Sequence, residues 1–360
     1  MKGLYEFYDY FNSLQSAAET VLNGGKPVYI YGMGNGGEKV LKWCKDHGIN
    51  VSGVFASDDF VRGQSFCGYR VKKLSEVESE SEDFIILLAF GTDLPDVMSR
   101  IEEYGKRHTL IAPDVPVIAG KYFEKSEFMD RFDEAAMVYG LLEDDDSRET
   151  FIKLTAYKIT GRLEYLREIF ASPEKSWELL KPGENEIYCD LGAYNGDTIA
   201  GFVENVNGKY RKIYALEPEK RNFQKCVRNS ITLENIEFHN AAAWSEDSVT
   251  YFDCGSGRQA KVSKKGVGKI CTRSLDSILA GRECTYVKYD VEGADIPVLK
   301  GSADTIRKYS PKICCALYHR CYDYIEIPLY INKMNGGYRF YMRQYPYYPA
   351  WETNLFAIRP

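Results

Sequence analysis

The sequence predicts an α/β protein made of two doubly wound, Rossmann-like domains joined by a helical connector. Short apolar runs alternate with helical periodicity in two separate parts of the chain, and a glycine-rich turn follows the first apolar run of each part. The stretch between these parts has helical periodicity and many charges, and 360 residues are enough for two hydrophobic cores. We therefore expect domains at residues 1–120 and 184–360 and a connector at residues 121–183.

The N-terminal domain is expected to begin with one amphipathic helix, over residues 4–22. Apolar side chains recur there at helical spacing, and Gly24 and Gly25 end the pattern. Three strands are expected next, at residues 27–31, 51–55 and 84–90. Helical stretches follow the first and the third of these strands, an alternation that predicts a parallel sheet.

The C-terminal domain repeats this alternation. Its expected strands lie at residues 186–191, 212–216, 236–240, 286–289, 312–318, 338–342 and 354–358. The last two are predicted to pair around an aromatic loop at residues 345–351. The flat rings of this loop suit either stacking on a sugar or ordinary packing.

Composition argues against several classes of protein. The formal net charge of −6 disfavours a nucleic-acid partner, because backbone binding needs a local excess of Lys and Arg, and the short basic stretch at residues 258–269 is interpreted as a surface loop. No apolar run reaches the about 18 residues of a membrane helix, and the N-terminus lacks a signal-peptide layout, so we expect a cytoplasmic protein. Ten scattered cysteines without a C-x-x-C pair and four dispersed histidines predict no metal site and no disulfide framework.

The first glycine turn, Gly32–Gly37 (GMGNGG), follows a strand and opens a helix. With Asp58 and Asp59 after the next strand, it has the context of a dinucleotide-binding loop, in which glycines let backbone N–H groups approach a phosphate. The same turn is needed by any doubly wound sheet. Two interpretations stay open: a site for a nucleotide or nucleotide-sugar, and a scaffold that supports a homodimer.

This N-terminal part, with its glycine turn, its Asp58-Asp59 pair and Gly68-Tyr69-Arg70-Val71, resembles the small Rossmann-like domain of some bacterial sugar acyltransferases. The resemblance implies recognition of a nucleotide-sugar or a carbohydrate. It does not by itself assign a reaction to this domain.

The second glycine turn, Asp190–Thr198 (DLGAYNGDT), has a different layout. An acid ends the strand, and three residues separate the two glycines, whereas a dinucleotide loop needs G-x-G-x-x-G. Glu217 and Pro218 follow the next strand, where a carboxylate can accept hydrogen bonds from both hydroxyls of a ribose. The pattern predicts a ligand that has a ribose and an amino acid end but no pyrophosphate, such as S-adenosylmethionine.

A third motif, Lys288–Asp295 (KYDVEGAD), precedes Leu299-Lys300-Gly301. In this order, the three motifs of the C-terminal half resemble the FkbM-type methyltransferase family. The resemblance implies a class I methyltransferase fold, S-adenosylmethionine as cofactor, and O-methylation of a hydroxyl on a sugar, glycan or secondary metabolite. It assigns cofactor binding to Asp190, Gly192, Ala193, Tyr194, Asn195, Gly196, Asp197, Thr198, Glu217 and Pro218. Tyr194 is a departure, because methyltransferases commonly have glycine there.

Three side chains are candidates for the base that takes the acceptor's proton: Asp290, Glu292 and His319. His319 is favoured, because imidazole titrates near neutral pH and Asp323 lies close enough in sequence to orient it. Alternatives stay open. His319 could be an ordinary loop histidine hydrogen-bonded to Asp323, and the two acids could cap the helix that follows them. A divalent ion held by Asp290, Glu292 and His319 is less favoured.

Two other functions stay open for the whole chain. One is a non-catalytic or regulatory protein that binds a nucleotide or nucleotide-sugar. The other, less favoured, is an NAD-dependent enzyme centred on Gly32. A small-molecule or glycan acceptor is the partner that the methyltransferase interpretation requires.

Overall fold

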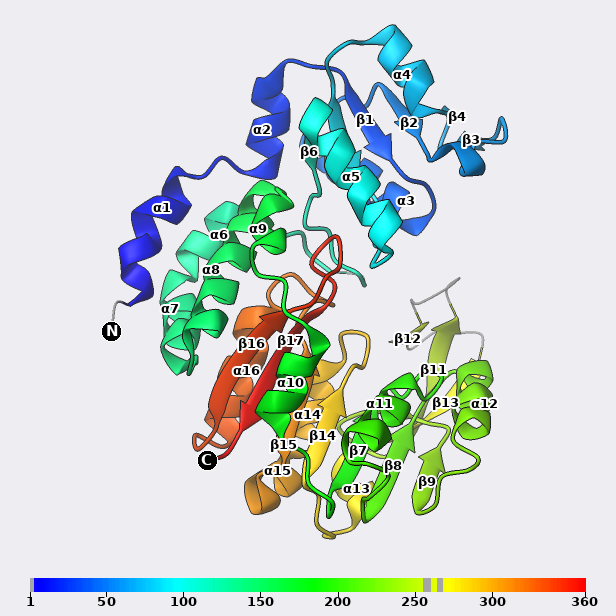
Figure 1. Cartoon of the computed structure of the whole chain (residues 1–360), viewed down its shortest axis with the longest axis vertical. Coiled ribbons are helices and arrows are strands. Elements are labelled where there is room, and N and C mark those ends of the chain that lie inside the picture. The colour runs from blue at the N-terminus through cyan, green and yellow to red at the C-terminus, as the bar shows by residue number, and fades with distance from the viewer. Residues whose placement is uncertain (1–2, 119, 255–259, 264–267) are drawn as a thin grey trace. The chain divides into compact units, whose positions relative to one another are not determined.

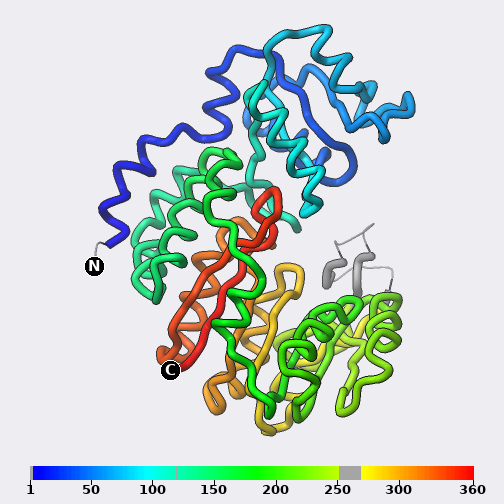
Figure 2. The backbone as a smooth tube through the Cα atoms, viewed as in Figure 1, coloured from blue at the N-terminus to red at the C-terminus, as the bar shows by residue number. Residues whose placement is uncertain are grey.

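The computed structural model describes residues 3–118, 120–254, 260–263 and 268–360. Figure 2 follows the backbone from the N-terminus in blue to the C-terminus in red. The chain divides into two compact units that both draw on its C-terminal segment. Unit 1 comprises Met1–Gly140, Asp145–Ala171 and Gln344–Glu352, and unit 2 comprises Leu141–Asp144, Ser172–Arg343 and Thr353–Pro360. The structure thus divides the segment predicted as a connector, residues 121–183, between the units. Half of the basic stretch at residues 258–269, namely residues 258, 259 and 264–267, lies outside the described residues.

Unit 1 contains a six-stranded sheet of order β3-β4-β2-β1-β5-β6 (Figure 1). The strands are β1 (Val28–Tyr31), β2 (Gly53–Phe55), β3 (Ser65–Phe66), β4 (Tyr69–Lys72), β5 (Ile85–Leu88) and β6 (Thr109–Ile111). All neighbouring strands are parallel except β3 and β4. Because β2 and β5 flank β1 on opposite sides, the winding reverses at β1, which confirms the doubly wound prediction.

Helices of unit 1 connect these strands and form a separate helical group. The connecting helices are α3 (Asn35–Asp46), α4 (Leu74–Glu80) and α5 (Pro95–Arg107). The helical group contains α6 (Lys125–Asp130), α7 (Phe132–Leu141), α8 (Asp145–Thr160) and α9 (Glu164–Arg167). Phe128, Phe151 and Tyr157 are fully buried in this group, which gives it an aromatic core.

The prediction of one helix over residues 4–22 is wrong. The structure has a 3₁₀ turn η1 (Leu4–Phe7) and two helices, α1 (Tyr8–Ser13) and α2 (Ala17–Gly24). Ser16 begins α2 with a capping box: its hydroxyl accepts the Glu19 N–H at 3.2 Å, and the Glu19 carboxylate accepts the Ser16 N–H at 2.7 Å. These reciprocal bonds favour a helix start at this point, although the apolar spacing runs on through it.

Packing explains the first glycine turn. A Cβ on Gly36 would lie 1.9 Å from the Ala89 carbonyl oxygen, and a Cβ on Gly37 would lie 2.8 Å from the Phe66 ring. Helix α3 can therefore approach the sheet only if these positions are glycine. The nucleotide-sugar site at this turn stays a prediction.

The aromatic loop at residues 345–351 belongs to unit 1. Tyr348 exchanges two backbone hydrogen bonds with Thr92, of 2.7 and 2.9 Å, and its hydroxyl donates to the Glu102 carboxylate at 2.8 Å. Gly91 leaves room for the Trp351 ring, since a Cβ there would lie 2.3 Å from it. For Tyr348, which is buried, the structure favours ordinary packing over sugar stacking.

Unit 2 contains a seven-stranded sheet of order β16-β17-β15-β14-β7-β8-β9 (Figure 1). The strands are β7 (Ile187–Leu191), β8 (Lys212–Leu216), β9 (Ile236–His239), β14 (Tyr286–Tyr289), β15 (Lys312–Ala316), β16 (Arg339–Gln344) and β17 (Thr353–Ile358). β17 is antiparallel to β15, and the strands from β15 to β9 are parallel. The winding reverses at β7, so a ligand crevice is expected at the carboxyl ends of β7 and β14.

The described part of unit 2 has seven helices, of which the first precedes strand β7 and the others come after it. They are α10 (Pro173–Leu180), α11 (Asp197–Asn205), α12 (Lys220–Asn229), α13 (Leu275–Leu279), α14 (Asp295–Lys300), α15 (Ala303–Tyr309) and α16 (Asp323–Met334). A second, four-stranded sheet has the order β10-β13-β11-β12, with β10 (Ala242–Ala243), β11 (Ser248–Cys254), β12 (Ala260–Ser263) and β13 (Gly268–Arg273). Among the described residues, no helix combines the length and the apolar character that crossing a membrane requires.

Candidate active site

The second glycine turn links β7 to α11 and passes directly beside the end of β14. Gly192 has a φ of 97°, and a Cβ on it would lie 2.0 Å from the Asp290 carbonyl oxygen, so only glycine fits. Gly196 has a φ of 88° and begins α11. Tyr194 adopts a φ of 46°, which is uncommon for a non-glycine residue, and its side chain is 45% exposed. The turn therefore keeps its backbone close to the ends of two central strands.

Asp190 is the fully buried acid of this turn. Its Oδ2 atom accepts a hydrogen bond from the Thr198 hydroxyl at 2.5 Å, while its Oδ1 atom is buried without a hydrogen bond among the described residues. In the parallel pairing of β7 and β14, Asp190 is the partner of Lys288. Burial raises the pKa of Asp190, and the Lys288 ammonium and the Thr198 hydroxyl oppose this rise.

Glu217 follows β8 and is joined to the glycine turn. Its Oε2 atom accepts the Tyr194 N–H at 2.9 Å, and its Oε1 atom accepts the Glu219 N–H at 2.8 Å. Burial raises the pKa of Glu217 to about 7, although both N–H groups favour the ionised carboxylate. The Glu217 carboxylate therefore links the segments that follow the neighbouring strands β7 and β8.

Asp290, at the end of β14, is held ionised by its neighbours. Lys288 Nζ lies 3.2 Å from Asp290 Oδ2, and the Tyr318 hydroxyl donates to Oδ1 at 3.4 Å. Burial opposes ionisation, but the charges of Lys288 and His319 outweigh it and hold the pKa of Asp290 well below its usual range. Asp290 can accept hydrogen bonds at neutral pH and carries no proton there.

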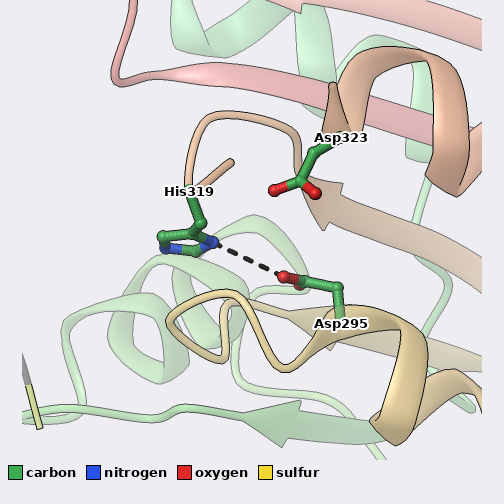
Figure 3. Close-up of side chains that lie close together, drawn as sticks. All are labelled: Asp295, His319 and Asp323. Atoms are coloured by element: carbon green, nitrogen blue, oxygen red, sulfur yellow. Dashed lines mark ion pairs between the residues drawn. The ribbon is translucent and has the colours of Figure 1, made fainter. Parts of the chain in front are cut away.

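His319 lies in the loop after β15 and is 1% exposed. Its Nε2 atom is 3.3 Å from Asp290 Oδ1 and 3.9 Å from Glu292 Oε2, and its Nδ1 atom is 3.6 Å from Asp295 Oδ2 (Figure 3). Burial favours the neutral ring, but the Asp290 and Asp295 carboxylates outweigh it and raise the pKa of His319 well above its usual value. The three predicted catalytic residues are thus brought together.

Asp323 does not orient His319 in the way the sequence suggested. Its Oδ2 atom accepts the Arg320 N–H at 2.8 Å, and among the described residues there is no hydrogen bond between Asp323 and His319. The ring nitrogen Nδ1 faces Asp295 instead (Figure 3). Burial, followed by the Asp295 charge, raises the pKa of Asp323 to about 7.

Glu292 sits in a tight turn between β14 and α14. It has a φ of 49°, and Gly293 beside it has a φ of 77°. A non-glycine residue in this left-handed region costs energy, and such residues gather at functional sites. The alternative that Glu292 or Asp290 caps the following helix gains no support from the N-cap residue of α14, which is Ala294 and provides no side-chain cap.

Asp295 faces His319, although sequence reasoning gave it no role. It belongs to the same motif as Asp290 and Glu292, but no role follows from its spacing alone. Asp295 is the first residue of α14, which follows the central strand β14 after a short turn. This place at a strand–helix junction is the signal that could have identified it. One atom from each of Asp295, His319 and Asp323 lies within 4.8 Å of the others, so these three side chains could hold a metal ion.

Comparison with known proteins gives a family-model match for part of the chain and a structural match over nearly all of it. Residues 190–342 match the model of the methyltransferase FkbM domain. The chain is similar to the crystal structure of a methyltransferase FkbM from Methylobacillus flagellatus KT, with a TM-score of 0.74 and 18% identity over 99% of this chain and 98% of that chain. An rRNA methylase from Streptococcus thermophilus gives a TM-score of 0.36 and 14% identity, over 52% of this chain and 97% of that chain. The chain matches none of the curated proteins compared with it. The similarity to the Methylobacillus flagellatus structure confirms the predicted α/β fold class.

Proposed function

We propose that this chain, whose residues 190–342 are a methyltransferase FkbM domain, transfers a methyl group from S-adenosylmethionine to a hydroxyl oxygen of a sugar, glycan or secondary metabolite. The observation that carries the donor assignment is the hydrogen bond from the Tyr194 N–H to the Glu217 carboxylate. It joins the glycine turn after β7 to the acid after β8. Both lie at the edge of the sheet where doubly wound proteins bind their ligands.

The chemistry of these residues fits the donor. Each Glu217 oxygen accepts one backbone N–H and keeps a second lone pair, so the carboxylate can also accept both hydroxyls of a ribose. The free Oδ1 atom of Asp190 suits a positively charged amino group. The residues proposed to hold the donor are Asp190, Gly192, Ala193, Tyr194, Asn195, Gly196, Asp197, Thr198, Glu217 and Pro218.

S-adenosylmethionine, when bound, supplies an electrophilic methyl group on a sulfonium. The protein's task is to align the acceptor oxygen with the methyl carbon, so that the new C–O bond forms as the C–S bond breaks. The acceptor's hydroxyl proton must also leave, and a carboxylate within hydrogen-bond reach can take it. Asp290 and Glu292 are the acids next to the cofactor turn that have partly exposed side chains.

Glu292 is the proton acceptor in this proposal, and His319 is a positioning residue. The Nε2 atom of His319 already faces Asp290 and Glu292, so it is not free to approach an acceptor hydroxyl. Asp290 is held ionised by Lys288 and is a weak base, but it can orient the hydroxyl. The Glu292 side chain is 38% exposed, so part of it is accessible to a substrate.

Transfer of a labelled methyl group tests this function. The full chain is incubated with S-adenosylmethionine that carries a trideuterated methyl group, together with fractions of bacterial glycans and small metabolites. Mass spectrometry should find a product with the label on an oxygen, and heat-treated protein should give none. A label on nitrogen or carbon would contradict O-methylation, and donor binding without any labelled product would favour the regulatory alternative.

A further inference from the structure

Three buried side chains of unit 2 converge beside the proposed active site. Asp295 is the first residue of α14, His319 follows β15, and Asp323 is the first residue of α16. They are 2%, 1% and 3% exposed, respectively. Figure 3 shows the three side chains directed toward a common point from three different segments. One oxygen or nitrogen atom from each lies within 4.8 Å of the other two.

Two atoms of this cluster are buried without a hydrogen bond among the described residues: His319 Nδ1 and Asp295 Oδ2. They face each other at 3.6 Å, which is too long for a hydrogen bond. Ligands of one divalent cation lie about 2.1 Å from the ion, hence about 3.0 Å apart at a right angle and about 4.2 Å apart when opposite. The separation of these two atoms falls between those values, so one ion could satisfy both.

The charges around the cluster favour a cation. A metal-bound His319 is neutral, and the contiguous group around it then contains five carboxylates (Asp190, Asp290, Glu292, Asp295 and Asp323) and two cationic side chains (Lys288 and Arg320). Uncompensated charge in a buried place is costly. A doubly charged ion would balance two of the three excess negative charges.

We propose that Asp295, His319 and Asp323 form a binding site for a divalent cation of the first transition row, such as Mn²⁺. Two carboxylates and one imidazole nitrogen are ligands that such ions accept. The ion occupies Nδ1 of His319 and leaves its Nε2–H to donate to Asp290, so the metal also fixes the ring between the two acids. This set replaces the one considered from the sequence, because Asp290 and Glu292 lie on the Nε2 side of the ring.

Electron paramagnetic resonance with Mn²⁺ tests the site on the full chain after treatment with a chelator and without S-adenosylmethionine. Bound Mn²⁺ is counted by the loss of the free-ion signal. We expect one ion per chain with a Kd on the order of 10 μM or lower. A pulsed experiment on the loaded protein should show coupling to a ¹⁴N nucleus, which reports the histidine ligand.

Variants locate the ion. Asp323→Asn keeps an oxygen that can accept the Arg320 N–H but removes a charged ligand, and should weaken Mn²⁺ binding at least tenfold. His319→Gln should abolish the ¹⁴N coupling. Asp304→Asn is the matched control: its side chain is 89% exposed and lies outside the cluster, so Mn²⁺ binding should be unchanged. Circular dichroism verifies that each variant is folded.

Measurements on the unaltered protein keep the inference falsifiable if a variant does not fold. A free-ion signal that equals the signal of protein-free buffer at about 1 mM added Mn²⁺, or a bound ion without ¹⁴N coupling, would overturn the site. Coupling that survives in folded His319→Gln would also overturn it. Since the methyl donor is absent throughout, failure of this site leaves the proposed function intact, and failure of donor binding leaves the cation site intact.

Discussion

The Glu217 carboxylate accepts the backbone N–H of Tyr194 at 2.9 Å. The acid that follows β8 therefore holds the glycine turn that follows the neighbouring strand β7. The second carboxylate oxygen is held by the Glu219 N–H at 2.8 Å. Both oxygens are therefore fixed before any ligand arrives. This pre-arranged carboxylate is the basis of the donor site that we propose.

Glu217→Gln should weaken S-adenosylmethionine binding at least tenfold, about 1.4 kcal/mol. An amide offers one acceptor oxygen where the carboxylate offers two, so one ribose hydroxyl and one backbone N–H lose their partner. Titration calorimetry measures the change. Glu283→Gln is the matched control, because that side chain is 47% exposed and pairs with Arg211 away from the turn. Equal affinity in both variants would remove Glu217 from the donor site.

The same residue predicts a pH dependence of stability. Burial raises the pKa of Glu217 to about 7 in the folded protein, above the about 4.3 expected when unfolded. Its contribution to the free energy of unfolding is therefore fully present below about pH 4 and is lost as the pH rises through about 7. Relative to Glu217→Gln, the unaltered protein should lose a few degrees of Tm between pH 5 and pH 8 in thermal scans without ligand. A difference in Tm that is constant across this range would contradict the raised pKa.

Gly192→Ala should destabilise the protein by about 2 kcal/mol or more, because the new Cβ would clash with the Asp290 carbonyl oxygen in addition to straining a φ of 97°. Gly208→Ala separates these effects. Gly208 also has a positive φ, of 75°, but open space around its Cβ position, so only the smaller backbone cost of about 1 kcal/mol is expected. Urea denaturation measures both. Equal losses would show that the close approach to Asp290 does not matter.

Glu292→Gln should lower turnover at least about a hundredfold if this side chain takes the acceptor's proton. Donor affinity should change less than twofold, since Glu292 is not among the residues proposed to hold the donor. Initial rates with the acceptor found by the labelling experiment, together with calorimetry, separate the two quantities. Glu283→Gln again serves as the control. If His319→Gln lowers turnover far more than Glu292→Gln, the proton acceptor is His319 and the assignment must be reversed.

Much of the fold and of the donor site could be predicted because it depends on local patterns. Buried parallel strands appear as short apolar runs, and Asp190, Glu217 and Asp290 each follow such a run directly. Since the carboxyl ends of parallel strands share one edge of the sheet, proximity of these acids follows once the strands are recognised. The boundaries of β8 and β14 agree with the predicted ranges for the same reason.

Other features depend on contacts that no local pattern reports. The break before Ser16 arises from a capping box inside a continuous apolar pattern. The placement of the aromatic loop in unit 1 depends on the pairing of Tyr348 with Thr92, which are 256 residues apart. The ion pair of His319 with Asp295, and not with Asp323, depends on the conformation of the loop after β15. Spacing along the chain cannot decide between two acids that both lie near the ring.

The central claim is that the turn after β7 and Glu217 bind S-adenosylmethionine. Titration calorimetry of the unaltered full chain with S-adenosylmethionine, and separately with NAD, tests it most directly. We expect one molecule of S-adenosylmethionine per chain, with a Kd on the order of 10 μM, and markedly weaker binding of NAD. No detectable binding of S-adenosylmethionine at millimolar concentration, or tighter binding of NAD, would contradict the account.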